Sequence, residues 1–138
     1  MTKSRAFAAI AAVTAFVVLL SACVAIGNAQ NADRPTGTFT DMRYHRDSGD
    51  VVGTEVHVVY SRSGYYVVYQ SSEGEPGIPV VVPAKVAGAE LEFDVPASVD
   101  SRGRFTGTFD AERLTGTFAG SQERVDLKRG SSYWDRSH

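Results

Sequence analysis

The chain has 138 residues, with 14 basic and 16 acidic side chains and a formal net charge of −2. This length is typical of one domain with a single modest core. The slight acidic excess excludes the basic surface with which proteins hold nucleic acids, so we expect no nucleic-acid partner.

The first 22 residues have the layout of an export signal. Lys3 and Arg5 provide a positive start, residues 6–20 form an uninterrupted apolar stretch, and the small residues Ser21 and Ala22 follow. This order of segments is typical of a signal peptide, which is not part of the folded domain.

Residues 20–23 read Leu-Ser-Ala-Cys and resemble the lipobox of bacterial lipoproteins. In that family a peptidase cuts before the cysteine, and a diacylglycerol is joined to its sulfur. The resemblance implies that residues 1–22 are removed and that Cys23 becomes the lipidated, palmitate-bearing first residue of a cell-envelope lipoprotein. The membrane would then be a partner through the N-terminal lipid. Val24, in place of an aspartate, resembles the pattern that permits sorting to an outer membrane, facing the periplasm, in a cell that has one.

Two other outcomes for the N-terminus stay open. Apolar and small residues run on to Ala29 without a charge, so the segment also fits an uncleaved membrane anchor. Cleavage after Gly27-Asn28-Ala29 would instead release a secreted or periplasmic protein. The only cysteine of the chain cannot form an internal disulfide if it bears lipid, so packing alone must stabilise the exported domain.

Residues 23–34 form the lipidated cysteine and a polar, aperiodic tether, and residues 35–138 form a single domain. In this domain β-branched and aromatic residues alternate with polar ones at a period of two. The alternation predicts strands over residues 36–44, 54–61, 65–71, 79–86, 90–95, 103–110, 113–119 and 124–129.

The connections between these strands are too short for the dozen or so residues that a parallel crossover needs. We therefore predict an all-β fold, a small antiparallel up-and-down barrel of about eight strands, with a β-sandwich as the alternative. Pro83 lies inside the fourth strand and removes a hydrogen-bond donor, which predicts an edge or a bulge at that strand.

The alternation also assigns the face that packs inside the barrel. Glycine precedes an aromatic residue by two positions at 37–39, 107–109 and 116–118, which we interpret as a bend filled by the ring. The residues expected inside are Phe39, Val56, Val58, Tyr60, Leu91, Phe93, Val95, Phe105, Phe109, Leu114, Phe118, Val125 and Leu127.

The residue types of the domain do not indicate catalysis. His45 lies in a loop near Asp47 and Asp50, but one histidine with two unsupported carboxylates does not make a closed metal site. His57 is expected to face away from the core, and His138 ends the chain. We therefore expect no enzymatic activity, no metal and no cofactor.

Two segments are candidates for binding a partner. Glu73 and Glu75 belong to the loop at 73–79, which proline and glycine make stiff and which carries acidic side chains. Tyr133 and Trp134 follow the last strand, where an aromatic pair either plugs the open end of a barrel or contacts a partner. We favour the plug for this pair.

The hairpin at residues 61–65 supplies a third candidate. Tyr65 shares the face of Val67 and Tyr69, which leaves Tyr66 as the ring that points outward beside the turn. An exposed tyrosine beside a turn offers a rigid, amphipathic contact for recognition.

Small eight-stranded envelope lipoproteins that inhibit lysozyme are similar to this chain in size, targeting and predicted strand content. Residues 60–65 resemble their serine- and glycine-rich inhibitory loop, and Tyr133-Trp134 resembles their aromatic strand. The chain departs from them in lacking paired cysteines and in the position of its tyrosine-tryptophan pair. The Glu-Gly-Glu-Pro turn at 73–76 and Ser-Tyr-Trp-Asp at 132–135 also resemble uncharacterised small proteobacterial β proteins, which implies no activity.

The sequence thus favours a tethered, non-catalytic binding or inhibitory module with a periplasmic protein as its partner. A carrier of a small apolar ligand and a purely structural envelope protein are the alternatives. The aromatic side chains expected inside the barrel argue against a carrier, because eight strands enclose room for only one small ligand.

Overall fold

The structure, a computed structural model, describes residues 34–121 and 123–135. The expected signal peptide at residues 1–22, Cys23, the tether as far as residue 33 and His138 lie outside the described residues. No helix in the described part of the chain is long and apolar enough to cross a membrane.

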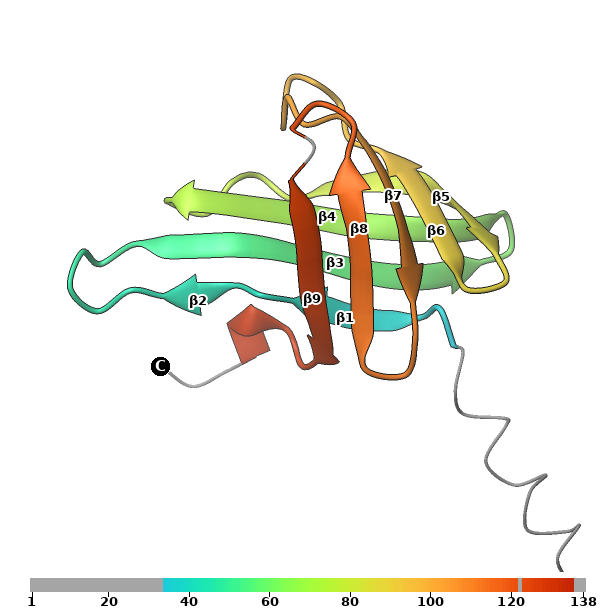
Figure 1. The fold of residues 1–138 in the computed structure, drawn as a ribbon, viewed down its shortest axis with the longest axis horizontal. Helices are drawn as coiled ribbons and strands as arrows, with labels where there is room; N and C mark the ends of the chain where they lie inside the picture. The colour runs from blue at the N-terminus through green and yellow to red at the C-terminus, as the bar shows by residue number, and fades with distance from the viewer. Residues whose placement is uncertain (1–33, 122, 136–138) are drawn as a thin grey trace, which may run out of the picture. The chain divides into compact units, whose positions relative to one another are not determined.

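The described residues form β-strands and one short 3-10 turn, η1, drawn in Figure 1. The elements are β1 (Gly37–Thr40), β2 (Arg43–Tyr44), β3 (Val51–Ser61), β4 (Gly64–Gly74), β5 (Val80–Ala87), β6 (Glu90–Asp94), β7 (Arg104–Phe109), β8 (Arg113–Phe118), β9 (Arg124–Gly130) and η1 (Tyr133–Asp135).

The strands form one antiparallel sheet in the order β1-β9-β8-β7-β6-β5-β4-β3-β2, and β1 also pairs with β3. This second pairing of β1 closes the sheet into a barrel of eight strands, with β2 added on β3. The predicted all-β barrel is confirmed, and the β-sandwich is not the fold.

The first predicted strand, at residues 36–44, is interrupted between β1 and β2. The carboxylate of Asp41 accepts a hydrogen bond from the backbone N–H of Thr54 at 2.6 Å, and the N–H of Met42 donates to the hydroxyl of Thr40 at 3.1 Å. Gly53 makes the close approach feasible, because it has a φ of +119° and a Cβ there would lie 2.7 Å from Asp41 Oδ1. Side-chain hydrogen bonds therefore replace part of the strand ladder at this point.

The core follows the predicted alternation, with one exception. Tyr60 is 66% exposed, although its position in the alternation assigned it to the interior. The pairing of β1 with β3 extends only to Val58, so β1 does not cover the end of the β3–β4 hairpin. There the ring of Tyr60 packs on the ring of Tyr65. The buried cluster contains Phe39, Val56, Val58, Val67, Tyr69, Val82, Leu91, Phe93, Val95, Phe105, Phe109, Leu114, Phe118, Val125 and Leu127.

The expectation of an edge or a bulge at Pro83 is wrong, because β5 is paired on both sides, with β4 and with β6, and its register with β4 runs through Pro83 without an extra residue. The ladder with β6 begins only at Ala84, directly after the proline. The missing N–H of Pro83 is tolerated at the beginning of that ladder rather than at a free edge.

Gly107 and Gly116 lie opposite each other on β7 and β8. A Cβ on Gly107 would lie 2.7 Å from the ring of Phe105, and one on Gly116 would lie 2.5 Å from it. The two glycines therefore make the space into which this core ring packs. The ring is that of Phe105, two residues before Gly107, and not the aromatic residue that follows each glycine in the Gly-Thr-Phe pattern.

Arg129 fixes the beginning of the described chain to the barrel. Its guanidinium donates to the backbone carbonyls of Arg34, Thr36 and Asp110 at 2.7 to 3.0 Å and lies 4.3 Å above the centre of the Phe39 ring. The segment that leads into β1 is thus held at the end of the barrel that carries the β7–β8 turn.

Candidate functional site

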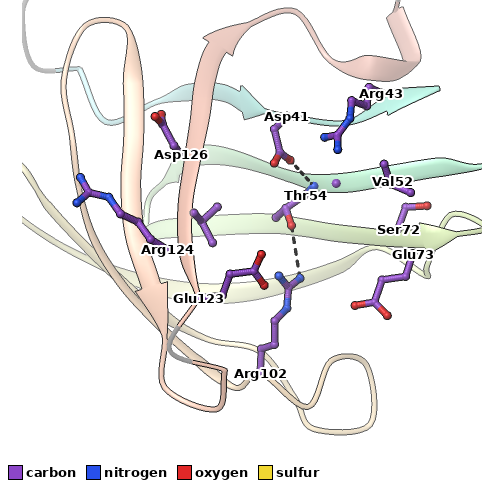
Figure 2. Close-up of a pocket in the computed structure, with 12 residues that line it drawn as sticks. Asp41, Arg43, Val52, Thr54, Ser72, Glu73, Arg102, Glu123, Arg124 and Asp126 are labelled. Carbon is purple, nitrogen blue, oxygen red and sulfur yellow. Dashed lines mark hydrogen bonds between the residues drawn. The ribbon is translucent and has the colours of Figure 1, made fainter. Parts of the chain in front are cut away.

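A pocket of about 430 Å³ lies between β9 on one side and β2, β3 and β4 on the other; Figure 2 shows the residues that line it. In Figure 1, β9 runs across the direction of β2, β3 and β4, which extend past it to one side. The residues that line the pocket include Asp41 just before β2, Arg43 on β2, Thr54 on β3, Glu73 on β4 and residues at the start of β9.

The opening lies where β1 stops pairing with β9. Their register pairs Thr40 with Lys128, and its continuation would place Met42 opposite Asp126. The pairing instead ends at Lys128, because the chain turns aside at Asp41 and continues as β2 along β3. The first half of β9 is therefore left without a strand on this side in the described part of the chain.

Arg102 and Thr54, which form the floor of the pocket, belong to a hydrogen-bonded cluster. Arg102 reaches in from the loop between β6 and β7 and binds the carboxylate of Asp100 at 2.8 to 3.2 Å, the hydroxyl of Tyr69 at 2.6 Å and the hydroxyl of Thr54 at 3.4 Å. The Tyr69 hydroxyl donates to Asp100, and Arg102 also stacks on the ring of Phe118. Arg102 and Asp100 thus form a salt bridge that packs against an aromatic ring.

The surroundings of this cluster shift the ionisation of its members. Burial by itself would raise the pKa of the Asp100 carboxyl, but the hydrogen bonds from Arg102 and Tyr69 outweigh it and hold that pKa well below its usual range. Burial, with the hydrogen bond to Asp100, raises the pKa of the Tyr69 hydroxyl above its usual range. The cluster is therefore a neutral ion pair with a protonated tyrosine at neutral pH, which gives neither a nucleophile nor a general base.

The mouth of the pocket has an excess of negative charge. Figure 2 shows the side chains of Glu73, Glu123 and Arg102 directed into the space between the strands. The charge of Arg102 is neutralised by Asp100. The carboxylates of Glu73, Glu123 and Asp41 then outnumber the guanidinium of Arg43. Arg124 and Asp126 also line the pocket, but their side chains point away from Arg102 in Figure 2.

The described residues contain no group of three histidine, cysteine, aspartate or glutamate side chains placed to hold a metal ion. His45 is exposed in the turn after β2, and His57 lies half-buried on the outer face, with Nδ1 2.7 Å from the hydroxyl of Thr38. The pocket can accept a cationic group through the carboxylates that line it.

The acidic loop that the sequence indicated is divided between two places. Glu73 lines the pocket, whereas Glu75 is exposed beyond the end of β4. The loop turns back at Gly77, whose N–H donates to the carbonyl of Ser71 and whose carbonyl accepts from the side chain of Gln70. A Cβ at Gly77 would lie 2.6 Å from that Ser71 oxygen, so glycine is needed for this close turn.

Tyr66 faces outward from β4, as expected, and is half-buried between neighbouring strands. It lies opposite Val59 on β3 and Pro83 on β5. Its neighbour in the same row of the outer face is Val68, opposite the exposed Val81.

The aromatic pair after β9 lies in η1, and the preferred expectation that it plugs the barrel end is wrong. The N–H of Tyr133 and the hydroxyl of Ser132 donate to the carboxylate of Glu55, and the indole N–H of Trp134 donates to Gln70 at 2.8 Å. Glu55 and Gln70 are paired on β3 and β4 and face outward, opposite to the core residues beside them. Tyr133 is consequently buried against the outer wall, and Trp134 is half exposed there.

The structure brings Tyr66 and Trp134 to one outer wall and places Glu73 at the pocket, away from that wall. The sequence interpretation missed Arg102 and Asp100, which appeared only as charges in a loop. It also missed Val81, because an unbroken run of three valines in β5 hides which of them faces out. Comparison of the chain with protein-family models, with curated proteins and with solved structures finds no match.

Proposed function

We propose that the protein is a lipid-anchored, non-catalytic binding or inhibitory module of the bacterial cell envelope, which docks a partner protein on its outer wall. The observation that carries the proposal is an apolar patch on the outer face of β4 and β5 and the elements beside it. We call it the outer-wall patch, and its members are Tyr66, Val68, Ile78, Val81, Pro83 and Trp134.

Three apolar members of the outer-wall patch expose a large fraction of their side chains to water, which is unfavourable unless a partner covers them. Ile78 is 80% exposed, Val81 66% and Trp134 49%. Gln70 joins the two ends of the patch, since its amide binds the indole of Trp134 and the carbonyl of Gly77, the residue before Ile78. A tryptophan and a tyrosine among aliphatic side chains are typical of the residues that dominate binding energy in protein interfaces.

The interior of the barrel supports a binding module over a carrier. The rings of Phe93, Phe105 and Phe118 lie with their centres 5.0 to 6.4 Å apart, and Tyr69 packs on two of them. These rings occupy the space that a small apolar ligand would need. Recognition through the outside of the barrel is therefore favoured.

Lipid anchoring at Cys23 is part of the proposal and has its own test. Labelled palmitate fed to expressing cells should enter the protein and should be lost in Cys23→Ala. Incorporation that survives this change would contradict lipidation at Cys23.

Binding is tested by capture of proteins from a periplasmic extract on the domain of residues 34–138. Val81→Ser, Trp134→Ala and Tyr66→Ala should each weaken capture of the same protein while leaving the melting temperature nearly unchanged. Val99→Ser is the matched control, because Val99 is an exposed valine outside the patch. Capture that is equally strong with all four variants would exclude the outer wall as the docking surface.

A further inference from the structure

The opening between β9 and β2 leaves backbone hydrogen-bonding groups of a strand unpaired. The N–H of Arg129 donates to the carbonyl of Glu112 at 2.6 Å, so the odd-numbered residues of β9 direct their backbone groups toward β8. The even-numbered residues direct theirs to the other side, where β1 pairs with Lys128 and Gly130.

Arg124 and Asp126 are the even-numbered residues of β9 that lie before this pairing begins. Their N–H and C=O groups thus face the pocket and have no strand partner among the described residues. A barrel normally leaves no such edge, because closure pairs every strand on both sides. The edge from Arg124 to Leu127 comprises four residues, and its first and last Cα atoms lie about 10 Å apart at the usual strand rise.

We infer that this opening is a strand-addition site, which takes an extended segment of a partner protein, about four residues long, with a lysine or arginine side chain directed into the pocket. The segment would pair with the free edge of β9 through main-chain hydrogen bonds, which provide affinity without depending on sequence. This site is separate from the outer-wall patch and does not depend on it.

The charge of the pocket selects the side chain. The carboxylates of Glu73 and Glu123 face the pocket and form no ion pair within the described residues. Arg102 below them is already neutralised by Asp100, so the floor does not repel a cation. Because side chains alternate along a strand, every second residue of an added segment would point toward these carboxylates.

The opening also lies away from the part of the chain that leads to the expected lipid anchor. Arg129, which holds residues 34–36, and Arg124, at the opening, are at opposite ends of β9, about 17 Å apart at the usual strand rise. A partner segment can therefore approach the free edge without crossing the beginning of the described chain.

The test uses a capped hexapeptide of alternating valine and lysine, added to the ¹⁵N-labelled domain of residues 34–138. We expect the amide resonances of Arg124 and Asp126 to shift and their hydrogen exchange to slow. The same peptide with N-methylated backbone amides, and a peptide of alternating valine and glutamate, should leave these amides unchanged. Response to the N-methylated peptide, or no response to the lysine peptide at millimolar concentration, would overturn the inference.

Variants of the pocket distinguish selection by charge from non-specific binding of the peptide. The double variant Glu73→Gln/Glu123→Gln should weaken binding of the lysine peptide by about tenfold, since each removes one attraction of the partly exposed type. Glu75→Gln/Glu112→Gln removes the same charge away from the pocket and should bind as the wild type does. Equal losses in both pairs would contradict a specific role for the pocket carboxylates.

Two further outcomes locate the occupant. Trp134→Ala should bind the lysine peptide normally, so a failure of the outer-wall proposal leaves this inference standing. If the amides of Arg124 and Asp126 become protected on raising the protein concentration without peptide, a second copy occupies the edge, and a separate partner is ruled out.

Discussion

The ion pair under the pocket should stabilise the whole domain, and Asp100→Asn tests this most directly. The substitution keeps the shape of the side chain but leaves Arg102 as an unpaired cation. The side chains of Asp100 and Arg102 are only 11% and 17% exposed. Removing one partner of a buried pair costs about 3 to 5 kcal/mol, and the remaining exposure places the expected loss near the lower value, about 3 kcal/mol.

For a domain of this size, that loss corresponds to a decrease of about 12 to 24 °C in the melting temperature. Urea unfolding followed by far-UV circular dichroism should show a lower midpoint with an unchanged slope. Asp94→Asn is the matched control, because the Arg104–Asp94 pair is exposed and its loss should cost less than about 1 kcal/mol.

A double-mutant cycle decides whether the two side chains act as a pair. Arg102→Met combined with Asp100→Asn should recover part of the stability, because the double variant has no unpaired buried charge. A coupling free energy below about 0.5 kcal/mol would refute the reasoning, since it would mean that the two groups are solvated independently.

The same pair makes the stability depend on pH in a defined direction. The pKa of Asp100 is lowered in the folded protein, because the hydrogen bonds from Arg102 and Tyr69 outweigh the effect of burial. In acid the unfolded chain therefore binds the proton before the folded one does, and stability is present above the unfolded pKa and is lost as pH falls through the folded one. Asp100→Asn should lack this part of the acid destabilisation, which unfolding curves between about pH 5 and pH 2 would measure.

Three other substitutions have local and separable consequences. Glu55→Gln should release η1, so the emission of Trp134, the only tryptophan, should shift to the red while the barrel melts almost as before. Gly116→Ala should cost about 1 to 3 kcal/mol in urea unfolding, because a Cβ would lie 2.5 Å from the Phe105 ring, whereas Gly130→Ala meets nothing within 4 Å and should be near neutral. Arg129→Met should speed hydrogen exchange at the amides of residues 36–38, because three hydrogen bonds to carbonyls are lost, and unchanged exchange would show that other contacts hold this segment.

The strands could be predicted because their periodicity is a local property. Each of the eight predicted ranges overlaps an observed strand, and the short turns between them left only antiparallel pairing. The errors lie where the outcome depends on how far a neighbouring strand extends. Tyr60 obeys the alternation but is exposed, because β1 ends its pairing with β3 at Val58.

The pocket could not be predicted for a related reason. Tyr69 and Arg102 are 33 positions apart, and their hydrogen bond forms only because the β6–β7 loop folds over the end of the barrel. The opening itself depends on Asp41, whose hydrogen bond to the Thr54 backbone ends the pairing of β1 with β9. No periodicity or composition signals either contact.

The two proposed surfaces place different demands on a partner, and the proposed anchor would make weak binding at either one sufficient. The free edge of β9 offers main-chain hydrogen bonds to an extended, basic segment, whereas the outer-wall patch offers apolar area to a folded surface. With the beginning of the described chain fixed at the other end of β9 by Arg129, a lipid attached at Cys23 would keep the domain close to the membrane. Confinement of this kind raises the effective concentration of partners that share the membrane surface, so contacts of modest affinity would suffice for the function. The short edge and the small patch are therefore consistent with a tethered module. Cys23→Ala, which removes the attachment point of the lipid, should weaken partner capture in cells, whereas the purified domain of residues 34–138, which does not contain Cys23, gives the affinity of the partner without the anchor.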